Sequence, residues 1–536
     1  MAPSTTEFRQ PMALTPPRAR AAVPTTAATT TTTAAEPAEP RPTDTRTARP
    51  AGAFARRLRT RLPRRARPYA LVLLPAVLTL ATGLWGLERE HSMWRDESTT
   101  YQVAHRDLGA MLRTLGTVDV VHGLYYLLMY AVFACWDGGL WALRLPSVLA
   151  MAGAAAGVAL IGRRLAGPGA GLAAGLVFAL LPPVQRYAQE GRSYALVCAC
   201  VVWGTYLLLR AVAGRTRRAW WGYAATMALA CLLHEFAVLA LLAHGLTLRC
   251  ARVRGDAFWS WARAAAGAAV PLAPLVVVSQ QQAQQVAWIS APDVGQVAAF
   301  LGLALAAGAL ARVAGERRGR IGLPALALPL FVVPTALLMA ASALHPIYVD
   351  RYVLYGWLGF ALLLGAALDR AVRAARARGP ATVGVLCGVV AALLVAQVPY
   401  ALTLRTSQSR MDDTVAAARA VGELSEPGDG LLFLPFHRRE PLMSAPGEFH
   451  GLRDLALAQD ASSTGTLWGT ELPPSAIRAR MLRVERVTVI TDPRPSARPS
   501  PQEAVERAVL RDHFTVCERR PVRGMRVVRY ARPGTC

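Results

Sequence analysis

The 536-residue chain contains no lysine and no asparagine, and only 17% of its residues are charged. The two missing residue types indicate codon bias in a GC-rich bacterial genome and carry no functional information. The scarcity of charge excludes an ordinary soluble protein, in which about a quarter of the residues are charged. Hydrophobic residues make up 53% of the chain. They form blocks of about 16 to 25 residues, which match the roughly 30 Å hydrocarbon core of a bilayer. We therefore predict a polytopic membrane protein.

The net charge of +25 does not indicate nucleic-acid binding. The arginines lie at the ends of apolar blocks and in the N-terminal tail, where the positive-inside rule explains them. A nucleic-acid interface would gather them on one folded surface with aromatic or polar readers. The expected partner is the lipid bilayer, and no nucleic acid is expected.

Cysteines give no zinc motif. Six of the eight lie in or beside apolar blocks and are expected to act as small hydrophobic residues. The pair in "CAC" (198–200) is too closely spaced for a zinc site and lacks partners. Cys517 and Cys536 lie in the polar C-terminal region and would pair if that region faces an oxidising compartment.

The composition divides the chain into three parts. Residues 1–67 are rich in Pro, Thr, Ala and Arg and cannot bury a core, so we predict a disordered cytoplasmic tail. Residues 68–404 form the predicted transmembrane domain. Residues 405–536 alternate helical patterns with short apolar runs such as "LLFLPF" and "RVTVITD", which predicts a small α/β domain. No residue in this last part stands out chemically, and acceptor selection is its expected role.

The basic residues predict the direction of each span. Arg56–Arg67 anchors the first span inside, and arginines follow the inner end of each returning span. The block 122–136 is short for a span, and the alternation leaves it outside as a helix along the interface. The C-terminal domain is then extracytoplasmic. The eleven expected spans cover residues 69–87, 140–162, 169–187, 194–213, 219–233, 236–249, 264–279, 294–311, 322–344, 353–368 and 381–403.

With this topology, the polar residues of the outer loops converge on one side of the membrane. Any single carboxylate or arginine there is explained equally well as a solvated loop charge. An Asp-Glu pair together with arginines from two distant loops is harder to explain in that way, since charges at span ends usually pair or serve a function. His234 fits either a hydrogen-bonded structural histidine or a ligand.

Seven stretches in this order resemble the class C, polyprenyl-phosphate-sugar-dependent glycosyltransferases of the protein O-mannosyltransferase and aminoarabinose-transferase type. The resemblance covers roughly residues 70–405. The stretches are "RDESTTY" (95–101), "DVVHGLYYLL" (119–128), "ALRLPSVLAMAGAAAGVALIGRRLAG" (142–167), "RYAQEGRSYAL" (186–196), "LLHEFAVLALLAH" (232–244), "AWISAP" (287–292) and "DRYVLY" (350–355). The chain departs from the family where Gly123 follows His122 in place of a double proline, and where Gly191 replaces alanine.

The resemblance implies an enzyme that takes a hexose such as mannose from a polyprenyl-phosphate donor at the outer membrane face. Its acceptor would be a glycan, a lipid or a protein. Asp96 would be the general base for the acceptor hydroxyl. Glu97, the second carboxylate of the catalytic pair, would orient the acceptor or help to bind a divalent metal ion.

Four residues are implied to hold the donor phosphate, because a guanidinium binds phosphate in a bidentate manner. They are Arg192, Tyr194, Arg351 and Tyr352. Further contacts to substrate or metal are expected from Asp119, His122, Glu190, His234 and Glu235. A divalent metal ion stays open as a cofactor, since no strict metal motif is present. Inversion at the anomeric carbon is expected, because no separate carboxylate nucleophile is evident.

Two other classes of protein compete with this interpretation. A transporter would place ionisable residues near mid-bilayer and break helices in repeated halves, whereas the spans here are nearly free of charge and no halves repeat. A membrane scaffold or sensor gives no reason for carboxylates and arginines to converge at span ends. It also predicts no chemical consequence of Asp96→Asn.

Overall fold

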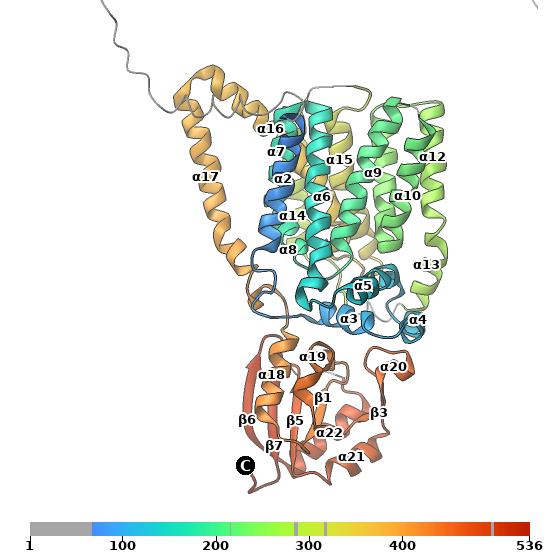
Figure 1. The fold of residues 1–536 in the computed structure, drawn as a ribbon, viewed down its shortest axis with the longest axis vertical. Helices are drawn as coiled ribbons and strands as arrows, with labels where there is room; N and C mark the ends of the chain where they lie inside the picture. The colour runs from blue at the N-terminus through green and yellow to red at the C-terminus, as the bar shows by residue number, and fades with distance from the viewer. Residues whose placement is uncertain (1–66, 215, 283–287, 316–318, 495–497) are drawn as a thin grey trace, which may run out of the picture. The chain divides into compact units, whose positions relative to one another are not determined.

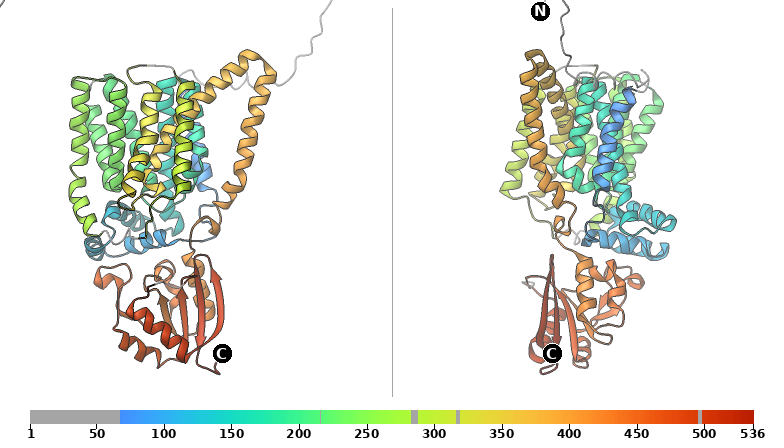
Figure 2. Two further views of the ribbon diagram at one scale, coloured as in Figure 1. Left: turned by 180° about the vertical axis from the view of Figure 1, so that it is seen from behind. Right: turned by 60° about the vertical axis from the view of Figure 1, so that its left-hand side comes forward.

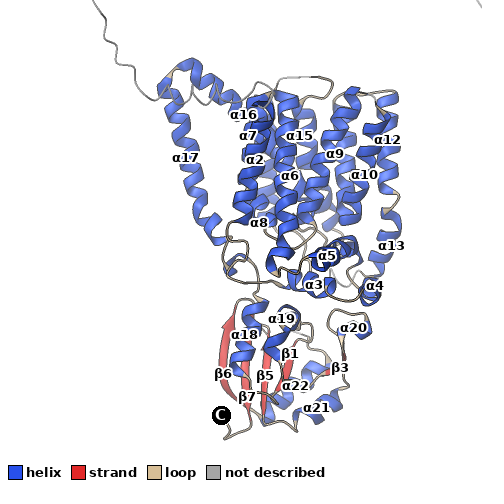
Figure 3. Ribbon diagram, in the orientation of Figure 1, coloured by secondary structure: helices blue, strands red, loops and turns tan. Residues whose placement is uncertain are grey.

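The computed structural model describes residues 67–214, 216–282, 288–315, 319–494 and 498–536. The predicted disordered tail lies outside these ranges except for Arg67, at which the first described helix begins. Described strands occur only from residue 430 onward, and the preceding part is helical, as the colours of Figure 3 show. This change of structure falls near the predicted boundary at residue 405.

Each of the eleven predicted spans contains a helix (Figure 1). These helices are α2 (Arg67–Leu84), α6 (Leu140–Ala166), α7 (Pro168–Leu180) with α8 (Pro182–Ala188), α9 (Tyr194–Gly214), α10 (Arg217–Leu233), α11 (Val238–Cys250), α12 (Asp256–Ala269) with α13 (Leu272–Gln281), α14 (Val294–Val313), α15 (Leu323–Ser342), α16 (Trp357–Arg378) and α17 (Pro380–Thr403). Six described helices are long and apolar enough to cross a membrane, or eight if each bent pair is one span. The bends are 62° between α7 and α8 and 41° between α12 and α13. The protein is a multi-pass membrane protein, and the count of eleven stays a prediction.

Small residues let the central spans approach closely. A Cβ on Gly365 of α16 would lie 2.3 Å from the backbone nitrogen of Ala174 on α7. One on Gly171 of α7 would lie 2.5 Å from the carbonyl oxygen of Ala159 on α6. Only glycine permits these approaches, and close backbone packing stabilises helix pairs in lipid, where the hydrophobic effect no longer drives association. Helix α7 is thereby held between α6 and α16.

The first long loop folds into three short helices, α3 (Arg95–Ala104), α4 (Leu108–Thr117) and α5 (Gly123–Cys135). Figures 1 and 2 show them gathered at the end of the bundle that adjoins the α/β region. Helix α5 lies where the interfacial helix was predicted. The sequence analysis did not predict α3 or α4. Helix α3 carries few apolar residues. Helix α4 carries two signals that were missed, apolar residues at helical spacing and an N-cap, the Asp107 carboxylate, which accepts from the Ala110 N–H at 2.9 Å.

The α/β region has a five-stranded sheet in the order β2-β1-β5-β7-β6. Strands β2 (Arg453–Asp454), β1 (Gly430–Leu434) and β5 (Arg486–Thr491) are parallel, whereas β7 (Met525–Ala531) and β6 (Thr515–Val522) continue the sheet in antiparallel fashion. The predicted strands at β1, β5 and β7 are present, and β6 was missed because its residues are mostly exposed and charged. A short hairpin of β3 (Leu457–Gln459) and β4 (Thr470–Glu471) lies outside this sheet.

Helices cover both faces of the sheet. Alternate residues of a strand point to opposite faces, and all five residues of β1 are buried. Leu431 and Phe433 pack with α18 (Thr414–Leu424), whereas Leu432 and Leu434 pack with α21 (Pro474–Met481) and α22 (Pro501–His513). Two-sided burial produces the continuous apolar run "LLFLPF", as expected for a strand between two helical layers.

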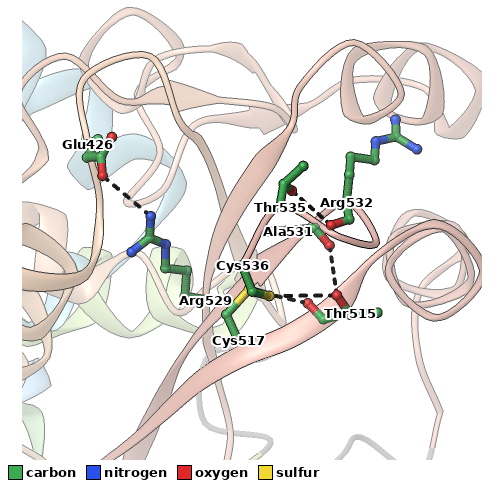
Figure 4. The surroundings of a disulfide bond; sticks show 8 residues. All are labelled: Glu426, Thr515, Cys517, Arg529, Ala531, Arg532, Thr535 and Cys536. Atoms are coloured by element: carbon green, nitrogen blue, oxygen red, sulfur yellow. Dashed lines mark hydrogen bonds and ion pairs between the residues drawn. A yellow bond between two sulfur atoms is a disulfide. The ribbon is translucent and has the colours of Figure 1, made fainter.

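A disulfide joins Cys517 on β6 to the C-terminal residue Cys536 (Figure 4). The Thr515 hydroxyl, on the same strand, donates to the Ala531 carbonyl at 3.3 Å. The disulfide and this hydrogen bond attach the chain end to the outer strand of the sheet. The two cysteines that the sequence analysis considered for pairing therefore do pair in the structure.

Candidate active site

The adjacent carboxylates Asp96 and Glu97 point in different directions from the first turn of α3. Successive residues of an α-helix are separated by about 100° around its axis, so only one of them can face any given surface. Glu97 is fully buried toward the spans, whereas Asp96 lines a cavity of roughly 590 Å³. The sequence analysis treated the two as one catalytic pair, and the fold separates them.

Glu97 is held by two arginines. Arg144 of α6 donates from Nε to Oε1 at 2.9 Å and from Nη2 to Oε2 at 2.8 Å, and Arg89 also donates to Oε2. The Gly191 N–H donates to Oε1 at 3.0 Å. Burial alone would raise the pKa of Glu97, but Arg144 and Arg89 lower it below its ordinary value. Both carboxylate oxygens are thus engaged, and Glu97 is not among the residues that line the cavity.

Asp96 has one charged partner. Arg351 donates from Nη2 to Asp96 Oδ2 at 3.2 Å, and from Nε to the Tyr194 hydroxyl at 3.1 Å. Four aromatic rings, those of Trp94, Tyr194, Trp288 and Tyr352, surround the guanidinium, with centroids 5.5–5.8 Å from its central carbon. Guanidinium groups are attracted to aromatic faces at such distances. Arg351, Tyr194 and Tyr352 line the same cavity as Asp96.

Arg192 approaches this cavity from the turn before α9. Its Nη1 donates to the Tyr126 hydroxyl at 3.1 Å and to the Thr100 hydroxyl at 3.3 Å. Its Nη2 lies 3.7 Å from Asp119 Oδ2. Asp119 adopts a left-handed backbone with φ of +59°, which aspartate tolerates better than most residues. The structure therefore brings Arg192 and Arg351 to one cavity, although they lie 159 positions apart in the sequence.

The two histidines of the predicted site pack against the tyrosine rings that surround Arg351. The His234 ring lies 4.5 Å from the Tyr352 ring and 5.6 Å from the His122 ring. Burial lowers the pKa of both histidines, and Arg192 lowers both further, so each is neutral near pH 7. His122 lines the cavity of Asp96, whereas His234 and Glu235 line an adjoining, mostly apolar cavity of roughly 580 Å³. The two cavities share Val121 and Tyr352.

Glu190 lies outside both of these cavities. It is buried, and its Oε2 lies 3.3 Å from Arg410 Nε, which belongs to the segment before α18. The Ser147 hydroxyl donates to the Glu190 carbonyl at 2.6 Å. Glu190 therefore has no place in the wall of either cavity, although it lies near enough to Arg351 and Asp96 to interact with their charges.

The residues of the site fit a divalent metal poorly. Among the described residues, no group of three His, Cys, Asp or Glu side chains is placed to hold a metal ion. Glu97 is saturated by two arginines, and Asp119 has Arg192 at 3.7 Å, so a second cation beside either carboxylate would meet an existing positive charge. No step below uses a metal.

Sequence reasoning missed four residues that the α/β region contributes to the Asp96 cavity. They are His437, Glu440, Leu467 and Trp468. A signal for the first two was present, because "HRRE" (437–440) follows the buried strand β1, and polar residues after the carboxyl end of a parallel strand are typical of binding sites. Trp288, from the "AWISAP" stretch, also lines the cavity.

Part of the chain matches a known sequence family. Residues 121–277 match the model of the family described as dolichyl-phosphate-mannose-protein mannosyltransferase. The matched segment includes His122, Arg192 and His234, but not Asp96 or Arg351. No curated protein sequence matches the chain.

Solved structures share its fold. Crystal structures of ArnT from Cupriavidus metallidurans, bound to undecaprenyl phosphate and in the apo state, are 15% identical to the chain with a TM-score of 0.55. The matches cover 85% and 86% of this chain and 97% and 98% of theirs. The apo oligosaccharyltransferase of Archaeoglobus fulgidus is 11% identical, with a TM-score of 0.48, over 80% of this chain and 70% of its own. The match to ArnT confirms the predicted polytopic helical fold with a C-terminal α/β region.

Proposed function

We propose that this membrane glycosyltransferase with the class C fold transfers a hexose from a polyprenyl-phosphate donor. Mannose is the first candidate for the hexose. The acceptor hydroxyl would attack the anomeric carbon of the donor at the outer face of the cytoplasmic membrane. The observation that carries the proposal is one cavity of roughly 590 Å³ lined by the Asp96 carboxylate and by the guanidiniums of Arg192 and Arg351.

The two arginines suit the phosphate of the donor. Both are buried, and guanidinium groups bind phosphate oxygens through paired hydrogen bonds. Tyr194 and Tyr352 line the cavity beside them and add hydroxyl groups. The adjoining apolar cavity, which shares Tyr352, suits the first part of a prenyl chain. A cavity lined by charged groups and an adjoining apolar cavity, which share Val121 and Tyr352, match a ligand with a phosphate head and a hydrocarbon tail.

Asp96 is the proposed general base. The acceptor hydroxyl gives its proton to the carboxylate while its oxygen forms a bond to the anomeric carbon. The bond from that carbon to the phosphate oxygen breaks, and its electron pair stays on the polyprenyl phosphate, where Arg192 and Arg351 stabilise the charge. Direct attack inverts the anomeric configuration. This mechanism needs a single carboxylate, and Glu97 is assigned to positioning α3 instead.

The ion pair between Arg351 and Asp96 couples donor binding to the base. Before the donor binds, Arg351 donates to Asp96 at 3.2 Å. The phosphodiester monoanion of the donor competes for this guanidinium and thereby releases Asp96 for the acceptor hydroxyl. Substrate binding in the order donor, then acceptor, follows from this competition.

The extracytoplasmic placement of the α/β region is also proposed. Its disulfide between Cys517 and Cys536 supports an oxidising compartment, because the bacterial cytoplasm keeps thiols reduced. The positive-inside assignment of the spans leads to the same side. The Asp96 cavity lies between the span ends and this region, which supports a reaction outside the cytoplasm.

The test uses purified protein with labelled polyprenyl-phosphate mannose, glucose and galactose and a cell-envelope fraction as acceptor. We expect the wild type to transfer sugar from one of the donors and to form a product with an inverted linkage. We expect no transfer by Asp96→Asn. Asp137→Asn, an exposed aspartate of the same loop region, is the matched control and retains transfer. Equal transfer by Asp96→Asn and the wild type would exclude Asp96 as the base.

A further inference from the structure

The α/β region leaves two complementary polar atoms without partners at the cavity of Asp96. Glu440 Oε2 and Trp468 Nε1 are both buried, and neither has a hydrogen-bond partner within the described chain. One is an acceptor and the other a donor, and both residues line this cavity. A buried polar group without a partner costs roughly 1–3 kcal/mol, so such atoms at a cavity wall indicate a ligand that completes them.

Glu440 is not used by the fold. Its side chain is 4% exposed, at the start of the short helix α19 (Glu440–Ser444), which packs against α3. The neighbouring arginines have other partners, since Arg438 binds Asp492 and Arg439 donates to Asp454 at 2.9 Å. Burial raises the pKa of Glu440 to about 7. Arg438 and Arg95 lower this pKa in part, but among the described residues neither forms an ion pair with Glu440, whose carboxyl group lies in the wall of the Asp96 cavity.

Trp468 separates the Asp96 cavity from another one. Together with Leu467 it lines a further cavity of roughly 530 Å³ between α3 and the α/β region. Polar side chains from both sides face this space, including Tyr101, Gln102 and Ser462. The His437 ring lies on the Asp96 side of the indole. Its centroid is 5.9 Å from that of the Trp468 ring, and the two ring planes form an angle of 55°. The indole is therefore flanked by two cavities, and only one of them contains the proposed catalytic residues.

We propose that these two cavities are consecutive subsites for a carbohydrate acceptor at least two sugar units long. The unit that receives the hexose lies between Asp96 and Trp468, where Glu440 accepts from one of its hydroxyls and the Trp468 N–H donates to one of its oxygens. The next unit lies beyond the indole, beside Tyr101 and Gln102. This inference rests on the proposed transferase function and names the acceptor class for it.

The chemistry of the walls favours a carbohydrate over a peptide. A sugar ring offers an apolar C–H face to an aromatic ring and hydroxyl groups to a carboxylate and an indole N–H. An extended peptide is usually bound by an open strand edge that pairs with its backbone. The walls of the second cavity include side chains of α3, α19 and α20 (Ala461–Thr464), and strand β3 contributes a single lining residue, Leu457.

The kinetic test compares Glu440→Gln, Trp468→Phe and Trp468→Ala in the full-length protein. We expect Glu440→Gln and Trp468→Ala to raise the acceptor KM about tenfold, which corresponds to about 1.4 kcal/mol, with the donor KM unchanged. Trp468→Phe keeps the ring and loses only the N–H donor, so its effect is smaller. Glu448→Gln, which removes an exposed carboxylate eight residues away, is the matched control. An unchanged acceptor KM in all three variants overturns the proposal.

A binding measurement separates this inference from the proposed transferase function, because it needs no turnover. Linear tetrasaccharides of mannose, glucose, galactose and arabinose, and a serine- and threonine-rich peptide, are titrated into the full-length protein by calorimetry. Binding of a tetrasaccharide that exceeds that of its monosaccharide and is lost in Trp468→Ala supports the two subsites. Binding of the peptide alone, with loss in Trp468→Ala, or binding of no tetrasaccharide, overturns them. Failure of transfer with retained tetrasaccharide binding would count against the transferase proposal alone.

Discussion

Two ion pairs on opposite sides of α3 differ in how far their charges are saturated. Glu97 is fully buried, and two arginines and a backbone N–H use both of its oxygens. Asp96 is partly exposed at a cavity and has one guanidinium contact, at 3.2 Å. A saturated buried pair holds structure together, and removing one member leaves an uncompensated charge. An open pair can exchange its partner for a substrate. The comparison teaches that the role of a carboxylate depends on its burial and on its remaining capacity for hydrogen bonds. Glu97, buried between Arg89 and Arg144, forms a structural clamp. Asp96 keeps the capacity to bind a substrate.

The largest effect is expected from breaking the open pair. Asp96→Asn removes the proposed proton acceptor while keeping the size of the side chain, so we expect kcat to fall by about 10²–10⁴-fold. Thermal stability in detergent changes little, because the residue is partly exposed. The measurement is initial-rate kinetics alongside a thermal melt of the same preparation. A comparable loss of stability would mean that Asp96 is part of the clamp.

Breaking the clamp should give the opposite result. Glu97→Gln leaves Arg89 and Arg144 buried without their carboxylate, at a cost of about 3–5 kcal/mol. We expect a lowered melting temperature or loss of folded protein, and near-normal kcat for molecules that remain folded. Chromatographic yield and the melting curve measure this. A stable Glu97→Gln protein without activity would instead assign Glu97 to the chemistry.

The two arginines sharpen the same contrast. Arg351→Lys keeps the charge but loses the planar fork, so we expect the donor KM to rise by about tenfold with little change in stability. Arg144→Lys in the clamp should lower stability instead, because Arg144 also donates to the carbonyls of Leu87 and Ser92, each at 2.6 Å. Donor titrations and melting curves of the two variants form the comparison. Equal donor KM values in Arg351→Lys and the wild type would argue against a phosphate contact.

The smallest effect is expected at Glu506 of α22, a buried carboxyl group whose pKa is raised and not lowered as that of Glu97 is. Burial, followed by repulsion from Glu471, raises the pKa of Glu506 in α22 from 4.5 to about 8. A raised pKa stabilises the fold below pH 4.5, and this contribution is lost as the pH rises through 8. Glu506→Gln should therefore protect the α/β region by roughly 1–2 kcal/mol at pH 9 and have little effect at pH 5. Hydrogen exchange of the β5 amides measures it. Equal exchange in the two proteins at pH 9 would contradict the prediction.

Local sequence patterns predicted much of the fold. Hydrophobic block length and arginine placement indicated where helices form, and a helix occupies each of the eleven predicted blocks. The apolar runs of β1, β5 and β7 were visible because strands between two helical layers are buried on both faces. The exposed strand β6 and the polar helix α3 were not visible, since neither has an apolar periodicity of its own. Helix α4 was missed although its apolar residues recur at helical spacing.

The sequence by itself determined the membrane class, the helical blocks and the polar residues that gather on one side, because each depends on neighbours along the chain. Only the tertiary structure decided that Asp96 faces a cavity while Glu97 is clamped, and that Glu190 pairs with Arg410 behind the cavity wall. It also brought Glu440 and Trp468 to the cavity wall. These outcomes depend on which groups meet across hundreds of residues, and burial and pairing, rather than residue type, decide what a carboxylate does.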